Sequence, residues 1–267
     1  MGMRMSVDCR SLPVDNRAVS IDISGGYLRY LDVAEATISD LHLTIPAQAW
    51  TCILGRSGCG KSSLLRYLAH LLDDKAEWRG ELSTQPLCDL KGQIAYMAQQ
   101  DLLMPWLSVL DNVLLSTRLG ANIQTGDRAA LKIKAQELLQ QVGLADQAHC
   151  LPQQLSGGMR QRVALARTLM QDKSIVLMDE PFSALDAVTR YRLQDLAYRL
   201  LKDKTVVLIT HDPQEAIRLA DRLYIMQGKP AFAELLVVPT SETPRRLDAE
   251  CVVLQQTIMT RLEQDYE

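Results

Sequence analysis

Short apolar runs and segments of helical spacing alternate along the chain. The runs at 50–54, 175–178 and 206–209 are continuous and bounded by polar or turn-forming residues, which predicts buried strands. Over 163–170 and again over 252–262, apolar residues recur at intervals of roughly three and four positions, which predicts helices with one buried face. Helical patterns follow the strands, so the chain predicts an α/β fold.

The first of these strands leads into the glycine-rich stretch "GRSGCGKSS" and then into a helix that begins at Lys61. This is the GxxxxGK[ST] pattern between a strand and a helix, in which glycines let backbone amides wrap a phosphate. Lys61 supplies a mobile cation for the phosphate oxygens, and the Ser62 hydroxyl is placed to ligate Mg²⁺. The prediction is a nucleotide site formed by Gly55, Arg56, Ser57, Gly58, Cys59, Gly60, Lys61, Ser62 and Ser63.

Polar residues follow the two later strands. Asp179 and Glu180 come directly after the run 175–178, and ligands in an open α/β sheet sit beyond the carboxyl ends of the strands. Asp179 is therefore expected to reach the Mg²⁺ of the same nucleotide. Glu180 is expected to hold a water in line with the γ-phosphate, as a general base or a water-orienting group. His211, just beyond the run 206–209, can hydrogen-bond a γ-phosphate oxygen.

A second candidate anion site lies in the stretch "LSGGMRQR". Ser156, Gly157 and Gly158 stand immediately before the helical run 163–170. This order predicts a helix N-terminus whose amide groups and dipole face an anion. The residues alone do not explain why a chain with a phosphate loop would need this second site.

Together these stretches resemble the ATP-binding subunits of ABC transporters, whose subunits form a head-to-tail dimer. The resemblance implies that the helix start at 156–158 closes on ATP held by the phosphate loop of the partner. It also implies that Gln99 ligates Mg²⁺ and reports to a membrane partner, and that His211 is the switch histidine. Asp186, which ends the stretch "SALD", is implied to cross the dimer interface.

Two further positions are assigned through the same resemblance. Tyr30 is predicted to stack on adenine, with Tyr27 as the alternative, because a flat ring offers contact area to a base. The family usually has a glycine–acid pair before the phosphate-loop strand, and here that stretch reads "AQAW" at 47–50. We interpret it as a turn variant without catalytic consequence.

The resemblance covers nearly the whole chain and implies one P-loop ABC ATPase domain over residues 1–267. Its expected parts are a parallel-core sheet, an antiparallel β portion and a helical subdomain at about 101–160. A short C-terminal extension at about 229–267 contains the run 252–262. We expect this run to dock on its own domain rather than to regulate it.

Composition narrows the possible partners. A net charge of −3 and 47% hydrophobic residues are typical of a soluble globular protein and give no reason to expect nucleic acid. No apolar run approaches the ~18 residues that span a bilayer, so a permease on a separate polypeptide is implied. The expected form is a homodimer that uses ATP and Mg²⁺, peripheral on the cytoplasmic face of the inner membrane, with a periplasmic solute-binding protein as a further partner.

The stretch "LLMPWLSVLDNV" bears on the solute. Pro105 and Trp106 after Gln99 resemble importers of nitrate, sulfonates, taurine and thiamine pyrimidine precursors. A competing interpretation is that Trp106 simply packs the helical insert. The wider sequence looks most like the hydroxymethylpyrimidine branch, which makes that thiamine precursor the expected solute. The alternatives are import of sulfonate, taurine or nitrate, then an exporter, then an ABC ATPase outside transport.

Overall fold

A six-stranded sheet forms the centre of the protein in the computed structural model, which describes residues 18–119 and 128–265. Within these ranges the strand order is β5-β6-β7-β3-β8-β9, and only β9 runs antiparallel to its neighbour. The strands are β5 (Ile94–Met97), β6 (Ile175–Asp179), β7 (Thr205–Ile209), β3 (Trp50–Gly55), β8 (Arg222–Gln227) and β9 (Phe232–Leu236). The sheet confirms the predicted α/β class and its parallel core.

Both faces of the central strands are buried, which explains their continuous apolar sequence. In β3, Cys52 and Leu54 face one hydrophobic cluster and Ile53 faces the other. In β7, Val206 and Leu208 face the first cluster, and Val207 and Ile209 face the second. A strand with helices or a second sheet over each face has no solvated side on which alternation could appear.

The second cluster lies between the central sheet and a three-stranded antiparallel sheet of the described residues, ordered β2-β1-β4. These strands are β1 (Ser20–Tyr30), β2 (Ile38–Ile45) and β4 (Ala76–Gln85). Helix α1 (Lys61–Leu68) begins at the predicted residue and buries Leu64, Leu65 and Leu68 in this cluster. The expected antiparallel portion is therefore present, and it holds the helix that follows the phosphate loop.

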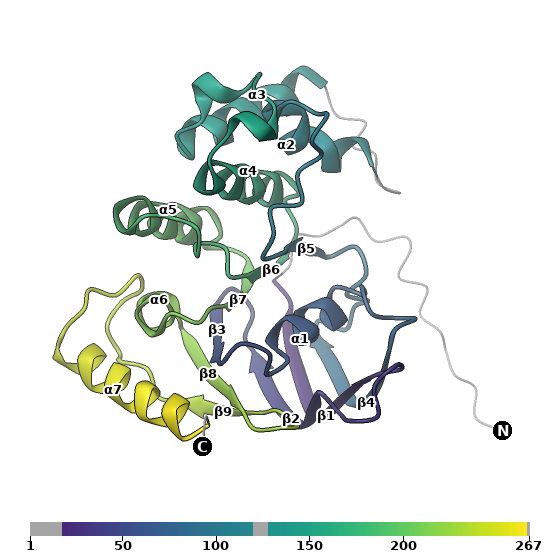
Figure 1. Cartoon of the computed structure of the whole chain (residues 1–267), viewed down its shortest axis with the longest axis vertical. Helices are drawn as coiled ribbons and strands as arrows, with labels where there is room; N and C mark the ends of the chain where they lie inside the picture. The colour runs from purple at the N-terminus through teal and green to yellow at the C-terminus, as the bar shows by residue number, and fades with distance from the viewer. Residues whose placement is uncertain (1–17, 120–127, 266–267) are drawn as a thin grey trace.

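Helices α2 (Val109–Arg118), α3 (Arg128–Gln141) and α4 (Gly157–Met170) form a lobe at the top of Figure 1, away from the antiparallel sheet. Short 3₁₀ turns at Ala145–Gln147 and Pro152–Gln154 connect α3 to α4. Residues 120–127 of the expected insert lie outside the described residues. Helix α4 also contacts β5, so the lobe reaches back to the central sheet.

The other helices of the described residues are α5 (Ala187–Leu200), α6 (Pro213–Leu219) and α7 (Ala249–Gln264). They lie below the lobe in Figure 1, with α5 directly beneath α4 and with α6 and α7 lower still. None of the helices in the described ranges is both long and apolar enough to cross a membrane.

The stretch "AQAW" forms a turn before β3, as the interpretation of it as a turn variant predicted. Gln48 lies in this turn at φ 54°, a left-handed conformation that glycine adopts without strain. Its backbone N–H donates to the Thr205 hydroxyl at 3.2 Å, which ties the turn to the start of β7. The turn geometry is thus kept without glycine, at a strain of roughly 1–2 kcal/mol.

Helix α7 packs on its own domain, as the C-terminal run predicted. Ile258 is fully buried and Leu254 and Leu262 are partly buried, but Val252 is half exposed. Cys251, which the pattern did not single out, is buried one position earlier. The buried face of α7 is therefore rotated slightly from the predicted one, because Cys251 acts as a small hydrophobic residue.

The far end of α7 reaches the phosphate loop. The Asp265 carboxylate accepts a hydrogen bond from the Gly228 N–H at 2.6 Å and lies 3.2 Å from the Arg56 Nε. Arg56 also donates to the Asp265 carbonyl at 2.5 Å. Both side chains are largely buried, so the end of α7 is fixed against the loop.

Replacing Ile53 by alanine should destabilise the protein by about 2–5 kcal/mol, because it removes a fully buried side chain from the middle of β3. Chemical denaturation measures the change, and Ile133→Ala on the exposed face of α3 is the matched control. Equal midpoints for the two variants would contradict this packing.

Candidate functional site

The parallel register brings the predicted site residues to one edge of the sheet. Ile209 at the end of β7 pairs with Ile53 of β3 on one side and with Asp179 of β6 on the other. The phosphate loop after β3, the acidic pair at the end of β6 and His211 after β7 therefore lie side by side. This arrangement is the one that the strand ends predicted.

The phosphate loop requires glycine for both backbone angle and space. Gly60 has φ 107°, and a Cβ there would lie 2.9 Å from Cγ2 of Thr37. The buried Lys61 ammonium donates to the carbonyls of Gly55 at 2.6 Å and Arg56 at 2.7 Å. Cys59 is also buried, with its sulfur 3.8 Å from the same ammonium. Lys61 is thus held inside the loop at the predicted helix start.

Asp179 is the most unusual charge at this edge. Its side chain belongs to a residue only 1% exposed, and within the described part of the chain neither carboxylate oxygen has a hydrogen-bond partner. Burial raises the pKa of Asp179, and the nearby Ser62 hydroxyl acts in the opposite direction. A buried carboxylate beside a hydroxyl is a donor set suited to a hard cation, so these residues fit Mg²⁺.

Glu180 is held in a strained backbone conformation, at φ 49°. Its N–H donates to the Ile209 carbonyl at 2.9 Å, and its own carbonyl accepts from Nε2 of Gln161 at 2.9 Å. A left-handed residue other than glycine costs roughly 1–2 kcal/mol, and such strain is maintained by its surroundings. The turn separates the Glu180 side chain from that of Asp179, as the predicted division of roles requires.

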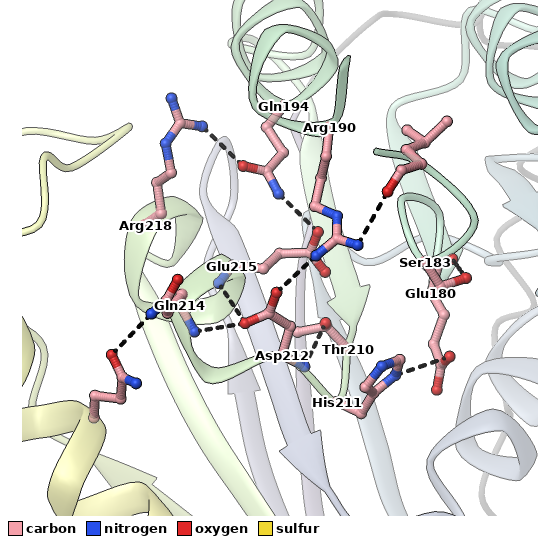
Figure 2. A network of polar contacts seen from close by, with 12 residues as sticks. Glu180, Ser183, Arg190, Gln194, Thr210, His211, Asp212, Gln214, Glu215 and Arg218 are labelled. Atoms are coloured by element: carbon pink, nitrogen blue, oxygen red, sulfur yellow. Dashed lines mark hydrogen bonds and ion pairs between the residues drawn. The ribbon is translucent and has the colours of Figure 1, made fainter. Parts of the chain in front are cut away.

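The Glu180 carboxylate meets both of the other candidate catalytic residues. Its Oε2 lies 3.0 Å from Nδ1 of His211 and accepts a hydrogen bond from Nε2 of Gln99 at 3.1 Å. Figure 2 shows the His211 ring facing this carboxylate. Three segments far apart in sequence thus place polar groups around one point, where a water molecule could be oriented.

The stretch "LSGGMRQR" starts helix α4 as predicted. The Ser156 hydroxyl accepts from the Met159 N–H at 3.3 Å and caps the helix, and Ser156 and Gly157 are exposed. Asp186 likewise caps α5 by accepting from the Thr189 N–H at 3.0 Å, and hydrogen bonds from the Thr189 hydroxyl and N–H lower its pKa. Ser156, Gly157 and Asp186 are thus exposed at the starts of the two helices.

The two tyrosines take different positions. The Tyr30 hydroxyl donates to the Ser63 hydroxyl at 2.9 Å, at the start of α1. The Tyr27 ring instead lies beneath the Arg79 guanidinium on the neighbouring strand β4. Of the two, Tyr30 is the one that contacts the phosphate loop.

Trp106 does not pack the helical insert. It is 72% exposed, and Leu102 nearby is also exposed. The start of this segment is held by α4, because Arg167 of α4 donates to the carbonyls of Asp101 and Leu102 at 2.6 and 2.8 Å. The exposure of Trp106 therefore belongs to a well-anchored segment, and the packing interpretation is wrong.

Sequence reasoning missed two side chains that hold the site together. Gln161 of α4 bonds the Glu180 carbonyl and also accepts from the Ala184 N–H at 2.9 Å. Arg190 of α5 bridges the loop before α5 to Asp212. A buried glutamine within an otherwise apolar helix face was a signal for the first, whereas nothing in the spacing marked the second.

A buried polar network lies behind His211 (Figure 2). Glu215 of α6 accepts a hydrogen bond from Gln194 of α5 at 2.8 Å, and Gln194 in turn accepts from Arg218 at 3.1 Å. Burial raises the pKa of Glu215, and hydrogen bonds from Thr210 and Gln194 oppose the shift. The network fixes α6 against α5 next to the segment that carries His211.

Comparison with known proteins agrees with this geometry. A family model described as ABC transporter matches residues 38–183. An uncharacterized ABC transporter ATP-binding protein of Haemophilus influenzae is 44% identical over 228 residues, which cover 83% of this chain and 90% of that protein. The aliphatic sulfonates import ATP-binding protein SsuB of Pectobacterium atrosepticum is 41% identical over 229 residues, covering 84% and 81%. The dimeric structure of MJ0796, a bacterial ABC transporter cassette, is similar with a TM-score of 0.67 at 30% identity, covering 85% of this chain and 100% of that chain.

Replacing Asp179 by asparagine should stabilise the protein without nucleotide or Mg²⁺ at neutral pH, because burial disfavours this charge more than Ser62 and the nearby cations favour it. The raised pKa makes this destabilisation full above the folded pKa of Asp179 and relieves it as pH falls from the folded pKa to the lower unfolded pKa. The advantage of Asp179→Asn should therefore shrink as pH falls from neutral towards the ordinary pKa of an aspartate.

Thermal unfolding with and without Mg²⁺ and ATP measures both effects. Mg²⁺ with ATP should raise the midpoint of the wild type but raise that of Asp179→Asn much less. The exposed Asp203→Asn is the control. A variant that is less stable than the wild type at neutral pH would contradict the assignment of an unpartnered carboxylate.

Proposed function

The chain belongs to the ABC transporter family as an ATP-binding subunit, and on this premise we propose that it energises import of a small solute, an aliphatic sulfonate in the first instance. As a member of the family it is an ATP hydrolase. The observation that carries the proposal is the meeting of Glu180, His211 and Gln99 beside the phosphate loop. This group supplies what phosphoryl transfer to water needs, namely a positioned phosphate and an oriented nucleophile.

Each residue has a part in the proposed hydrolysis. Backbone amides of the loop 55–63 bind the phosphates, and Lys61 exchanges its loop carbonyls for phosphate oxygens. Ser62, Asp179 and Gln99 would hold Mg²⁺, which neutralises phosphate charge when bound. Glu180 accepts a proton from the water that attacks the γ-phosphate, or orients that water.

Other assignments complete the nucleotide site. We assign His211 to a γ-phosphate oxygen, which its ring nitrogen can hydrogen-bond once the ring turns from Glu180. Tyr30 is the candidate for adenine stacking, supported by its contact with Ser63. The Tyr27 ring is engaged with Arg79, which makes it the weaker choice.

The working form is proposed to be a homodimer. The helix start formed by Ser156, Gly157 and Gly158 has its first two residues exposed, and a helix N-terminus attracts anions, which supports its use on ATP bound by the partner. Asp186 at the start of α5 is exposed in the same way. ATP would then join two chains, and its hydrolysis would release them.

A separate permease is the proposed membrane partner, with a periplasmic solute-binding protein beyond it. The exposed Leu102 and Trp106 follow directly on the loop that carries Gln99, which makes this apolar patch suitable for contact with the permease. The segment is anchored to α4 through Arg167, so movement of the permease would be transmitted towards the nucleotide. The proposed location is the cytoplasmic face of the inner membrane.

The solute is inferred from relatives, because the ATP-binding subunit itself does not contact it. SsuB of Pectobacterium atrosepticum is named for aliphatic sulfonate import, and SsuB 1 of Paracoccus denitrificans is 40% identical over 80% of this chain and 83% of that protein. These names support the sulfonate alternative over hydroxymethylpyrimidine. The exposure of Trp106 is compatible with either solute, since it would contact the permease.

Glu180→Gln should bind ATP as the wild type does and hydrolyse it about 10²–10⁴-fold more slowly, since an amide cannot accept the proton. Equilibrium binding of labelled ATP and release of inorganic phosphate measure the two steps. Glu137→Gln on the exposed side of α3 is the control. Hydrolysis within a few fold of the wild type would reject the role of Glu180.

A growth experiment tests the solute. A bacterium without its own sulfonate importer should use an aliphatic sulfonate as sole sulfur source when given this protein with its native permease and binding protein, but not with Glu180→Gln. A second strain that cannot make the thiamine pyrimidine, supplied with low hydroxymethylpyrimidine, forms the other arm. Rescue in the second arm alone would overturn the sulfonate proposal and leave ATP-driven import standing.

A further inference from the structure

Arg190 joins two loops of the site that are otherwise separate in sequence. Its guanidinium donates to the Leu185 carbonyl at 3.1 Å and to the Asp212 carboxylate at 3.1 Å. Leu185 belongs to the stretch "SALD", and Asp212 is the residue directly after His211. Figure 2 shows the guanidinium lying between these two loops.

Asp212 is also held by hydrogen bonds to residues close to it in the chain. Its Oδ1 caps α6 by accepting from the N–H of Gln214 at 2.9 Å and of Glu215 at 3.4 Å. Its own N–H donates to the Thr210 hydroxyl at 3.0 Å. Because His211 stands between Thr210 and Asp212, its backbone can shift only if Asp212 shifts with it. The contact with Arg190 is therefore a direct link between α5 and the residue that follows His211.

Helices α5 and α6 also share a deeper contact. Gln194, one turn beyond Arg190, donates to the buried Glu215, and Arg218 of α6 donates to Gln194 and Asp195. These bonds hold the two helices together below the site. Arg190 and Glu215 both line a small cavity together with Glu180, Ser183 and His211.

We propose that Arg190 is a positioning residue for ATP hydrolysis, which couples the loop before α5 to His211 and so to Glu180. This inference rests on the proposed function. A displacement of the "SALD" loop, such as docking of a second copy at Asp186 would cause, is carried by Arg190 to Asp212 and moves the His211 ring relative to the Glu180 carboxylate. The phosphate loop is not part of this chain of contacts, so the contacts that the loop makes with the nucleotide do not depend on it.

The fork geometry of arginine is required for this role. A guanidinium can hold a carbonyl and a carboxylate at the same time, whereas an ammonium is a single point of charge. Arg190→Gln should lower kcat roughly tenfold, the effect of losing one or two charged hydrogen bonds, and leave the KM for ATP within about twofold. Arg190→Lys should have a kcat between those of the wild type and Arg190→Gln, because it keeps the ion pair with Asp212 but loses the hydrogen bond to the Leu185 carbonyl.

A double-mutant cycle tests the contact itself. Asp212→Asn keeps an oxygen to cap α6 but removes the charge that faces Arg190, so it should reproduce the kcat of Arg190→Gln. The double variant should be no slower than either single variant, because both break the same contact. Arg192→Gln, exposed on the same helix, is the control and should match the wild type.

Binding of a non-hydrolysable ATP analogue and the unfolding midpoint are measured on every variant. An unchanged kcat in Arg190→Gln, or kcat losses that multiply in the double variant, would overturn the inference. If Arg190→Gln does not fold, Asp212→Asn decides, and a kcat equal to the wild type there rejects the coupling. Absence of hydrolysis by the wild type would instead count against the proposed function.

Discussion

The site depends on the parallel adjacency of three strands. Because β6, β7 and β3 are neighbours and run in one direction, the segments that follow them leave the sheet at the same edge. Residues from separate segments therefore come within hydrogen-bond distance, as His211 does with Glu180. The buried apolar faces of these strands supply the stability that permits such a concentration of charge at their ends.

The charged side chains at this edge of the sheet differ in how well they are paired. Lys61 is satisfied by carbonyls of its own loop, whereas Asp179 is buried and, among the described residues, has no hydrogen-bond partner. Glu180 has two side-chain contacts but a strained backbone. The structure thus keeps a potential metal ligand and a potential base in states that are unfavourable by themselves. The stability that the hydrophobic core provides offsets the free-energy cost of these two groups, as is common where a fold retains function at the expense of stability.

The sequence predicted those features that depend on local pattern. The strands 50–54, 175–178 and 206–209, the helix start at Lys61 and the cap at Ser156 are each determined by residues within one turn or strand. Their meeting at one edge followed from the general behaviour of parallel sheets. The choice between a sulfonate and a pyrimidine as the solute had no such basis, because no residue of this chain is expected to contact the solute.

What the sequence could not predict depends on tertiary packing. The exposure of Trp106 is set by how α4 holds the preceding segment, and an exposed tryptophan looks the same in sequence as a buried one. The bridge from Arg190 to Asp212 joins residues 22 positions apart on different elements. Gln48 is the reverse case, since its turn has a left-handed geometry although the sequence lacks the glycine that normally predicts one.

The contact between Asp265 and Arg56 has a practical consequence. Asp265 lies beside the phosphate loop and is joined to it by one ion pair. A dye coupled to a residue substituted for Asp265 would therefore sit next to Arg56 of this loop. Such labelling is a hazard for assays, because it removes the ion pair, and an opportunity, because the dye would respond to changes at Arg56.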